Sequence, residues 1–596
     1  MAETPTTNGA ENIFWDLSDL YASTDEKGLG GDLATIEQRS KDFRDRWYGK
    51  FASLSIADFM TMVQEYEQLV ENYDRMGSYV HLQWSTDSEH PEYGKLMQRV
   101  TETLSKASSH LIFVDTELSA LSEARITELL AAPEMASRKH WLERVMDYKP
   151  HTLSEDVEQA LSAKSVSSRF AWVRLHDEIS NAKMFTFRGQ ELTIAQMTKM
   201  LYDADRATRK EAAETLSAGL KTDAKTHAYV FNTIIGDCEV NDRLRKYPTW
   251  VSSRNMSNEV SDASVQALVD AVVSRYDLVH RYYALKQRLL GLDKLYDYDR
   301  YAPVTEDSDF YTWEEARKIV VDSYTSFDKR AGDIASMFFE KNWIHGPVKK
   351  GKRSGAYSAG TIASVHPYVF MNYTGTSRDV QTLAHELGHG VHQYLSRQQG
   401  PLLMDTPLTI AETASVFGEM ITFKKMFEAT TSDQSKLALI MSKLDGMIAT
   451  VFRQVALNRF ENAVHTTRRS QGEISLDQMN EIWLQTQTDQ FGNSVEFTPG
   501  YEVWWSYISH FIHTPGYVYA YAFGELLVLA LYQIYLESPE SFPDKYIELL
   551  SSGGSKRPEE LLAPFGLDIT SPTFWHNGLT FIENFLKQAE ELAEKS

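Results

Sequence analysis

The chain contains 596 residues, of which 42% are hydrophobic and 24% are charged. This composition is typical of a globular protein with a large core, and it excludes a chain that is disordered throughout. The formal net charge of −23 argues against a nucleic-acid partner, because proteins that bind nucleic acids present a basic face to the phosphates.

The first residues carry no recognisable targeting signal. Residues 1–12 lack the basic and apolar segments of a signal peptide, and we expect them to be disordered. The single cysteine, Cys238, rules out an internal disulfide and a cysteine-based zinc site. A lone thiol is compatible with a reducing compartment, so we expect a cytoplasmic protein.

Helical periodicity dominates the chain that follows. Apolar residues recur at three- and four-residue spacing over residues 32–165. A short alternating run at Met184–Thr193 turns at Arg188-Gly189 and predicts a small hairpin. We therefore expect an N-terminal helical lobe over residues 13–195, followed by a second domain over residues 196–596.

The most apolar segment of the chain is Val518–Leu536. Its length approaches that of a membrane-spanning helix, but Glu525 lies inside it and tyrosines recur along it. We expect a buried helix of a large protein and no membrane partner.

A loop, a short strand and a strong helix follow one another in the middle of the chain. Residues 346–360 are rich in Gly, Ser and Lys and predict a loop. The β-rich run Tyr368–Tyr373 comes next. Thr376 then begins a helix, since Asp379 stands at the spacing of a capping box.

This helix carries the sequence His385-Glu386-Leu-Gly-His389. Residues four apart on a helix lie on the same face, so the two imidazoles can occupy two corners of a tetrahedral zinc site. Glu386 would then lie beside the open position of the metal and could act as general base. The pattern predicts a zinc hydrolase that binds one Zn²⁺ ion.

A catalytic zinc site requires a third protein ligand. Glu412 is the preferred candidate, because Pro407 precedes it as a helix-start signal, and Asp405 is the alternative. Glu419 lies two turns beyond Glu412 and is suited to hold the far nitrogen of a histidine ligand. His392 lies two turns from His385, about 10 Å along the helix, which is too far to close the same site.

Several runs of sequence resemble the oligoendopeptidase F family, which belongs to the wider group of thimet-oligopeptidase-like zinc peptidases. These runs are Trp15–Tyr21, His366–Gly375, Asp379–His389, Ala411–Ser415 and His510–Gly524. The resemblance therefore extends over nearly the whole chain.

The resemblance implies a mainly α fold. Two helical lobes would flank a deep substrate channel, with a small β-element beside the zinc helix. His385, His389 and Glu412 would bind the metal. The β-element, Tyr368–Thr374, would pair with the extended backbone of the substrate. The substrates would be short, unstructured peptides.

The C-terminal segment is implied to stabilise the oxyanion that forms during peptide hydrolysis. By position in the resembled family, the donors would be His510, Tyr517 and Tyr521, although His513 is also available three residues after His510. The resemblance further implies that the peptide is contacted by Tyr373, Gly375 and His513.

Two other functions stay open at this point. One is a zinc carboxypeptidase or dipeptidyl carboxypeptidase, which would trim peptides from their ends. The other is a peptide-binding helical protein with a structural zinc ion. Glu386 argues against the second alternative, because a structural site needs no base.

Overall fold

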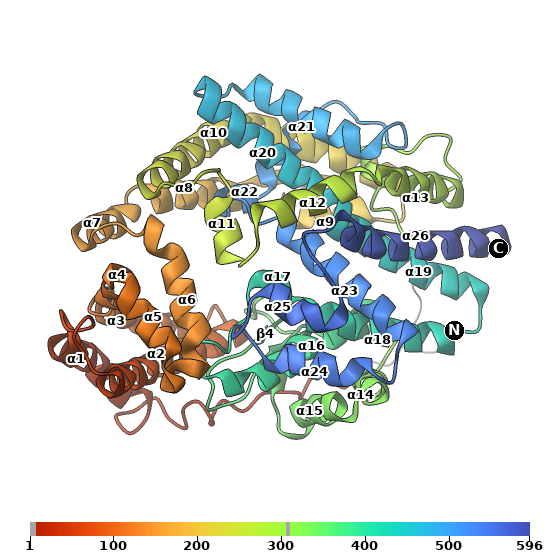
Figure 1. Cartoon of the computed structure of the whole chain (residues 1–596). Coiled ribbons are helices and arrows are strands. Elements are labelled where there is room, and N and C mark those ends of the chain that lie inside the picture. The colour runs from red at the N-terminus through yellow and green to blue at the C-terminus, as the bar shows by residue number, and fades with distance from the viewer. Residues whose placement is uncertain (1–6, 305–309, 596) are drawn as a thin grey trace. The chain divides into compact units, whose positions relative to one another are not determined.

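The computed structural model describes residues 7–304 and 310–595, which fold into two compact units (Figure 1). Unit 1 comprises Met1–Glu155, Asp307–Ala429 and Leu531–Leu567. Unit 2 comprises Asp156–Glu306, Thr430–Ala530 and Asp568–Ser596. The described residues are mostly helical, which confirms the predicted fold class. The substrate channel and the domain boundary at residue 195 stay predictions.

Unit 1 contains two groups of helices and a small sheet. Its helices are α1 (Leu29–Trp47), α2 (Ile56–Thr86), α3 (Pro91–Ser109), α4 (Phe113–Ala120), α5 (Glu123–Ala131), α6 (Lys139–Tyr148), α14 (Trp313–Phe327), α15 (Lys329–Glu340), α16 (Ser377–Ser396), α17 (Leu408–Ala411), α18 (Thr413–Ala429), α24 (Phe542–Ser551) and α25 (Pro558–Leu562). Its strands are β3 (Ile344–His345), β4 (Tyr357–Ala359) and β5 (Tyr368–Phe370).

Unit 2 is a helical body with one hairpin. Its helices are α8 (Arg169–Ala182), α9 (Ile194–Lys199), α10 (Arg206–Arg245), α11 (Ser252–Ser257), α12 (Asp262–Val273), α13 (Tyr276–Leu289), α19 (Asp433–Met447), α20 (Gln454–Gln471), α21 (Leu476–Phe491), α22 (His510–His513) and α26 (Pro572–Lys595). Two further helices, α7 (Glu155–Ser165) and α23 (Tyr519–Glu537), cross from one unit to the other along the chain.

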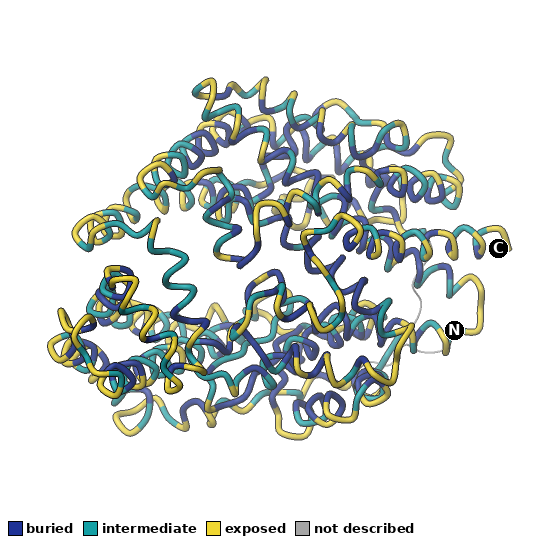
Figure 2. The backbone as a smooth tube through the Cα atoms, in the orientation of Figure 1, coloured by how far each residue is buried: buried dark blue, intermediate teal, exposed yellow. Residues whose placement is uncertain are grey.

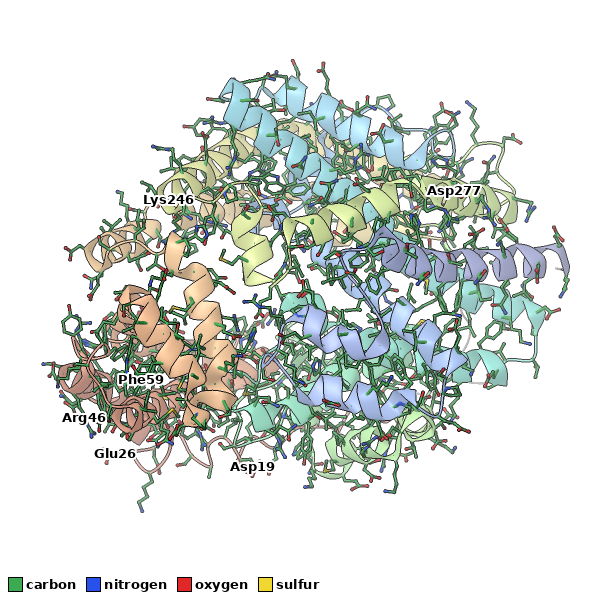
Figure 3. The ribbon with its side chains drawn as sticks, in the orientation of Figure 1. Asp19, Glu26, Arg46, Phe59, Lys246 and Asp277 are labelled. Atoms are coloured by element: carbon green, nitrogen blue, oxygen red, sulfur yellow. The ribbon has the colours of Figure 1, made fainter. Side chains whose placement is uncertain are left out.

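The helices bury one apolar face each, as helix α1 illustrates. Its buried residues are spaced alternately four and three apart: Leu29, Leu33, Ile36, Ser40, Phe43 and Trp47. Figure 2 shows the resulting alternation of buried and exposed positions along the helices of both units. Phe59 of α2 is fully buried against Phe51, whereas Glu26 and Arg46 are exposed (Figure 3).

The hairpin predicted at Met184–Thr193 is confirmed. Strand β1 (Met184–Phe187) pairs antiparallel with β2 (Gln190–Thr193). The two residues of the turn, Arg188 and Gly189, both have positive φ, at 49° and 79°. A two-residue turn of this kind matches the twist of the strands it joins.

The β-element of unit 1 is a three-stranded sheet in the order β3-β5-β4. Strand β5 is the centre strand, parallel to β3 and antiparallel to β4. The prediction of a loop over residues 346–360 is wrong for β4. This strand has only three residues, too few to show alternation in sequence, and Tyr357 stacks on Phe370 with ring centroids 4.9 Å apart.

The N-terminal segment is better ordered than the sequence predicts. Residues 1–6 lie outside the described residues. Asn8, however, donates from its side chain to the Tyr373 carbonyl at 2.9 Å and accepts from the Trp313 amide at 2.7 Å. Ala10 is buried. Contacts with residues more than 300 positions away hold this part of the chain, and a local pattern cannot reveal them.

The long apolar helix is a core element. Helix α23 meets the length and hydropathy of a membrane span, but 72% of its most apolar window is buried inside the protein. A single helix of this kind is what the core of a large protein contains. The prediction of a buried helix at Val518–Leu536 is therefore confirmed.

Candidate functional site

Helix α16 presents two histidines on one face. The helix begins with the predicted capping box: the Thr376 hydroxyl accepts from the Asp379 amide at 3.2 Å, and the Asp379 carboxylate accepts from the Thr376 amide at 3.1 Å. From this start, His385 and His389 lie one turn apart, and their Nε2 atoms approach to 3.2 Å. The capped helix therefore makes the two imidazoles converge.

Two glycines allow helix α18 to approach α16 closely. A Cβ on Gly388 would lie 2.4 Å from the Ala414 carbonyl oxygen, and one on Gly418 would overlap the Tyr324 hydroxyl. The Tyr324 hydroxyl donates to the Ala384 carbonyl at 2.7 Å. This approach brings Glu412, at the junction of α17 and α18, to the histidines. In the sequence, this close approach of the two helices is marked only by the glycines that interrupt their helical patterns.

The three expected ligand atoms form a nearly equilateral triangle. Glu412 Oε2 lies 3.5 Å from His385 Nε2 and 3.4 Å from His389 Nε2, which are themselves 3.2 Å apart. Ligands bound at about 2.0–2.1 Å around a tetrahedral ion are about 3.3 Å apart. The donor set and its spacing therefore fit a metal ion such as zinc.

Neighbouring side chains orient two of these three ligands. Glu419 accepts from His385 Nδ1 at 2.6 Å, which leaves Nε2 facing Glu412. The Ser415 hydroxyl donates to Glu412 Oε2 at 2.7 Å. Glu419 occupies the place expected from the sequence. Ser415 was not anticipated, because its only signal is its position three residues after Glu412.

The electrostatics of the triangle favour a cation. Burial alone would lower the pKa of His385, but Glu419, Glu412 and Glu386 raise it to about 9. Burial would raise the pKa of Glu412, yet His389 and His385 hold it at about 2. The carboxylates therefore favour positive charge at this position, and a metal ion that binds there would compete with protons for it.

Glu386 lies beside this centre and is almost completely buried. Burial raises the pKa of its carboxyl, and the neighbouring His385 and His389 oppose that rise. A carboxylate with a raised pKa is a better proton acceptor than one in water. The arrangement is suited to remove a proton from a water molecule.

The other candidate ligands lie outside the triangle. Asp405 is not part of the group formed by His385, His389 and Glu412. His392 is 3% exposed, and burial lowers its pKa to about 3. Its ring is thus a neutral core side chain of α16. Among the described residues, Glu412 is the carboxylate that completes the group with the two histidines.

Unit 2 brings His510 together with two tyrosines. His510 Nε2 lies 3.1 Å from the Tyr521 hydroxyl, and the ring of Tyr517 stacks parallel to that of His510 at 6.3 Å. The rings of Tyr517 and Tyr521 are 5.0 Å apart. His513 instead bonds to Asp177 at 2.8 Å. Of the two candidate oxyanion donors, His510 therefore lies with the two tyrosines, whereas His513 lies with Asp177.

The expected substrate contacts near the β-element lie partly in the core of the protein. Tyr373 is fully buried, and its hydroxyl donates to the Tyr311 carbonyl at 2.7 Å, so its side chain belongs to the core. The Gly375 carbonyl accepts from the Tyr311 amide at 2.8 Å. Strand β5 has a partner strand on both sides, but it covers only Tyr368–Phe370, so the pairing of a peptide with the rest of the predicted element, residues 371–374, stays a prediction.

The chain matches known families over most of its length. The model of "Peptidase family M3" matches residues 199–581, and the model of "Oligopeptidase F" matches residues 117–185. These two ranges lie on either side of the predicted boundary at residue 195. The resemblance to oligoendopeptidase F is confirmed.

Curated and solved proteins extend these matches. The chain is 26% identical to the Group B oligopeptidase PepB of Streptococcus agalactiae over 98% of both chains. It is also 26% identical to the oligopeptidase PepF of Bacillus subtilis, covering 98% of this chain and 87% of the relative. The crystal structure of oligoendopeptidase-F from Enterococcus faecium shares the fold, with a TM-score of 0.72 at 21% identity over 95% of this chain and 98% of that one.

Proposed function

Because the chain belongs to peptidase family M3, we propose that it is a zinc-dependent endopeptidase that cleaves internal bonds of short, unstructured oligopeptides. The observation that carries this function is the triangle of His385, His389 and Glu412, with Glu386 beside it. Two imidazoles and one carboxylate are the ligand set of a catalytic zinc ion with an open position. When bound, the ion supplies Lewis acidity to water and to the scissile carbonyl.

The residues of the chain then move the protons. Glu386 removes a proton from the attacking water and delivers it to the amine that leaves. Glu419 keeps His385 in the tautomer whose Nε2 is free for the metal. No side chain is required to form a bond with the substrate.

The oxyanion requires hydrogen-bond donors of its own. We assign this role to His510, Tyr517 and Tyr521, which gather in unit 2. Burial, together with the charge of Arg453, lowers the pKa of His510. Neutral imidazole and phenol groups can both donate to a developing negative charge.

An extended peptide would pair with strand β4. Strand β5 is already paired on both sides, whereas β4 is an edge strand of the sheet. An edge strand offers free backbone groups to a peptide without selecting its side chains. The Gln393 side chain of α16 contacts Ser358 of β4 at 2.7 Å, which connects this strand to the histidine-bearing helix.

A cleavage map tests the function directly. Unstructured peptides of graded length, together with one folded protein, would be incubated with zinc-loaded enzyme and with Glu386→Gln. Mass spectrometry should show internal cuts in short peptides only, and none with the variant. Stepwise trimming from the C-terminus would indicate the carboxypeptidase alternative. The absence of cleavage by zinc-loaded wild type would indicate a binding protein.

We also place the enzyme in the cytoplasm. The one cysteine, Cys238, is partly buried, and desolvation raises the pKa of its thiol to about 11. Such a thiol is unreactive, and a chain without disulfides is suited to a reducing compartment.

A further inference from the structure

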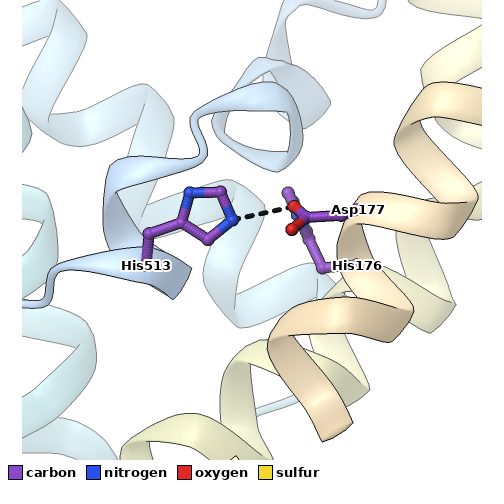
Figure 4. Close-up of side chains that lie close together, drawn as sticks. All are labelled: His176, Asp177 and His513. Carbon is purple, nitrogen blue, oxygen red and sulfur yellow. Dashed lines mark hydrogen bonds and ion pairs between the residues drawn. The ribbon is translucent and has the colours of Figure 1, made fainter. Parts of the chain in front are cut away.

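A second group of metal-ligating side chains lies in unit 2 and shares no residue with the triangle of His385, His389 and Glu412. It joins His176 and Asp177 of α8 to His513 of α22 (Figure 4). One ligand atom from each residue lies within 4.8 Å of the other two. We propose that these three residues form a second metal site that takes a divalent transition-metal ion such as Zn²⁺.

Two of the three distances within this group are close to those of a metal site, and the third is within 4.8 Å. Asp177 Oδ1 lies 2.8 Å from His513 Nε2 and 3.4 Å from His176 Nδ1. Tetrahedral ligands lie about 3.3 Å apart. A bound ion would therefore widen the first contact slightly and keep the second.

The two imidazole rings are also oriented like the catalytic pair. The rings of His176 and His513 meet at 81° with centroids 6.0 Å apart. Those of His385 and His389 meet at the same angle of 81° with centroids 4.8 Å apart. The second pair is thus 1.2 Å wider (6.0 − 4.8) and would draw together around an ion.

His176 is prepared to act as a ligand. It is only 3% exposed, and its Nδ1 is the atom that faces Asp177. The ring of His227 packs edge-on against that of His176, with centroids 5.0 Å apart, and holds it in place beside Asp177.

The surroundings explain both the choice of ion and the access to the site. Two nitrogens and one carboxylate oxygen suit Zn²⁺ and its neighbours in the first transition series better than Ca²⁺ or Mg²⁺. The side chains of Asp177 and His513 are each 40% exposed, which leaves room for an ion and its water ligands. Because His513 must give up its contact with Asp177, we expect weaker binding than at the triangle in unit 1.

An ion at this site would fasten α22 to α8. Arg169 already donates to the His513 carbonyl at 3.3 Å, so the two helices meet before any ion binds. His510 stands at the other end of the four-residue helix α22, and Tyr517 follows shortly after. If the proposed function is right, the second ion therefore steadies the segment that carries the oxyanion donors.

Metal stoichiometry tests the site independently of activity. The full chain, stripped with a chelator, would be equilibrated with Zn²⁺ by dialysis and its metal content measured by mass spectrometry. Wild type should bind two equivalents, whereas His513→Ala and Asp177→Asn should each bind one. The exposed His90 provides a matched control, and His90→Ala should keep both equivalents.

The variant His385→Ala separates the two sites. It should lose the catalytic ion and keep the second, and His385→Ala combined with His513→Ala should bind none. A single equivalent in wild type, or two in His513→Ala, would overturn the second site. If His513→Ala binds one equivalent fewer than wild type but zinc-loaded wild type cleaves no peptide, the second site is supported and the proposed function is rejected.

Hydrogen exchange provides a further readout of the fastening of α22. Addition of Zn²⁺ beyond the first equivalent should slow amide exchange in residues 510–517 of wild type, but not of His513→Ala. Equal exchange in both proteins would reject the effect of the ion on this segment.

Discussion

The close approach of α16 and α18 makes Gly388 a sensitive point, and Gly388→Ala is the perturbation that tests it. The new methyl group would lie 2.4 Å from the Ala414 carbonyl oxygen, whereas ordinary contacts begin at 3.4 Å. The helices must therefore separate by about 1 Å, and Glu412 begins the moving segment. Ligand distances in metal sites lie within about 0.2 Å of their usual values.

The expected cost is large for so small a substitution. A displacement of about 1 Å at a catalytic group lowers turnover by about 100-fold, equivalent to about 2.7 kcal/mol. We expect Gly388→Ala to lose zinc affinity and activity while its helical circular dichroism stays unchanged. Zinc content, turnover on a quenched fluorescent peptide and thermal unfolding would be measured on the same preparation.

Gly77 offers a matched control. It also lies inside a helix of unit 1, but a Cβ there would meet no atom of the described residues within 4 Å. Gly77→Ala should therefore keep full activity and raise stability by about 0.4–1 kcal/mol. Wild-type zinc content and turnover in Gly388→Ala would show that the close approach does not position Glu412.

Four further predictions concern single residues. Glu386→Gln should keep zinc but lose most turnover, and an active variant would remove this residue from the role of base. Glu412→Ala should lose zinc, measured by metal analysis; full occupancy would point to another carboxylate. Tyr517→Phe should lower kcat more than it raises KM, and an unchanged kcat would make Tyr517 a packing residue. Burial raises the pKa of Glu461 from 4.5 to about 8, so its contribution to stability is complete below about pH 4.5 and lost as the pH rises through 8. The melting temperature of wild type should therefore fall relative to that of Glu461→Gln as the pH rises from 4.5 to 8. Parallel plots of melting temperature against pH for the two proteins would contradict this.

Local spacing was sufficient to predict the centre of the site. His385 and His389 follow from the helical period, and the start of their helix follows from Thr376 and Asp379. The hairpin turn follows from Arg188-Gly189. In each case the determining contact lies within a few residues along the chain.

Contacts between distant residues account for what the sequence could not show. Tyr373 became a core residue because Tyr311 and Trp313, about 60 positions earlier, enclose it. The support of Glu412 by Ser415 depends on how α18 packs on α16. The edge position of β4 depends on its pairing with β5. Its three residues are too few for the sequence pattern to indicate a strand.

The division of each unit into three chain segments has a consequence for synthesis on the ribosome. Unit 1 is completed only by Leu531–Leu567, which follows its preceding segment after about 100 residues of unit 2. The hydroxyl of Tyr546 in that last segment donates to the Thr413 carbonyl at 2.9 Å, directly beside Glu412. A nascent chain that has already exposed its histidines therefore lacks the support of its third ligand until residues 531–567 have also been translated, more than 100 residues later. Late completion of this kind would keep an unfinished peptidase inactive while other new, still unstructured chains surround it.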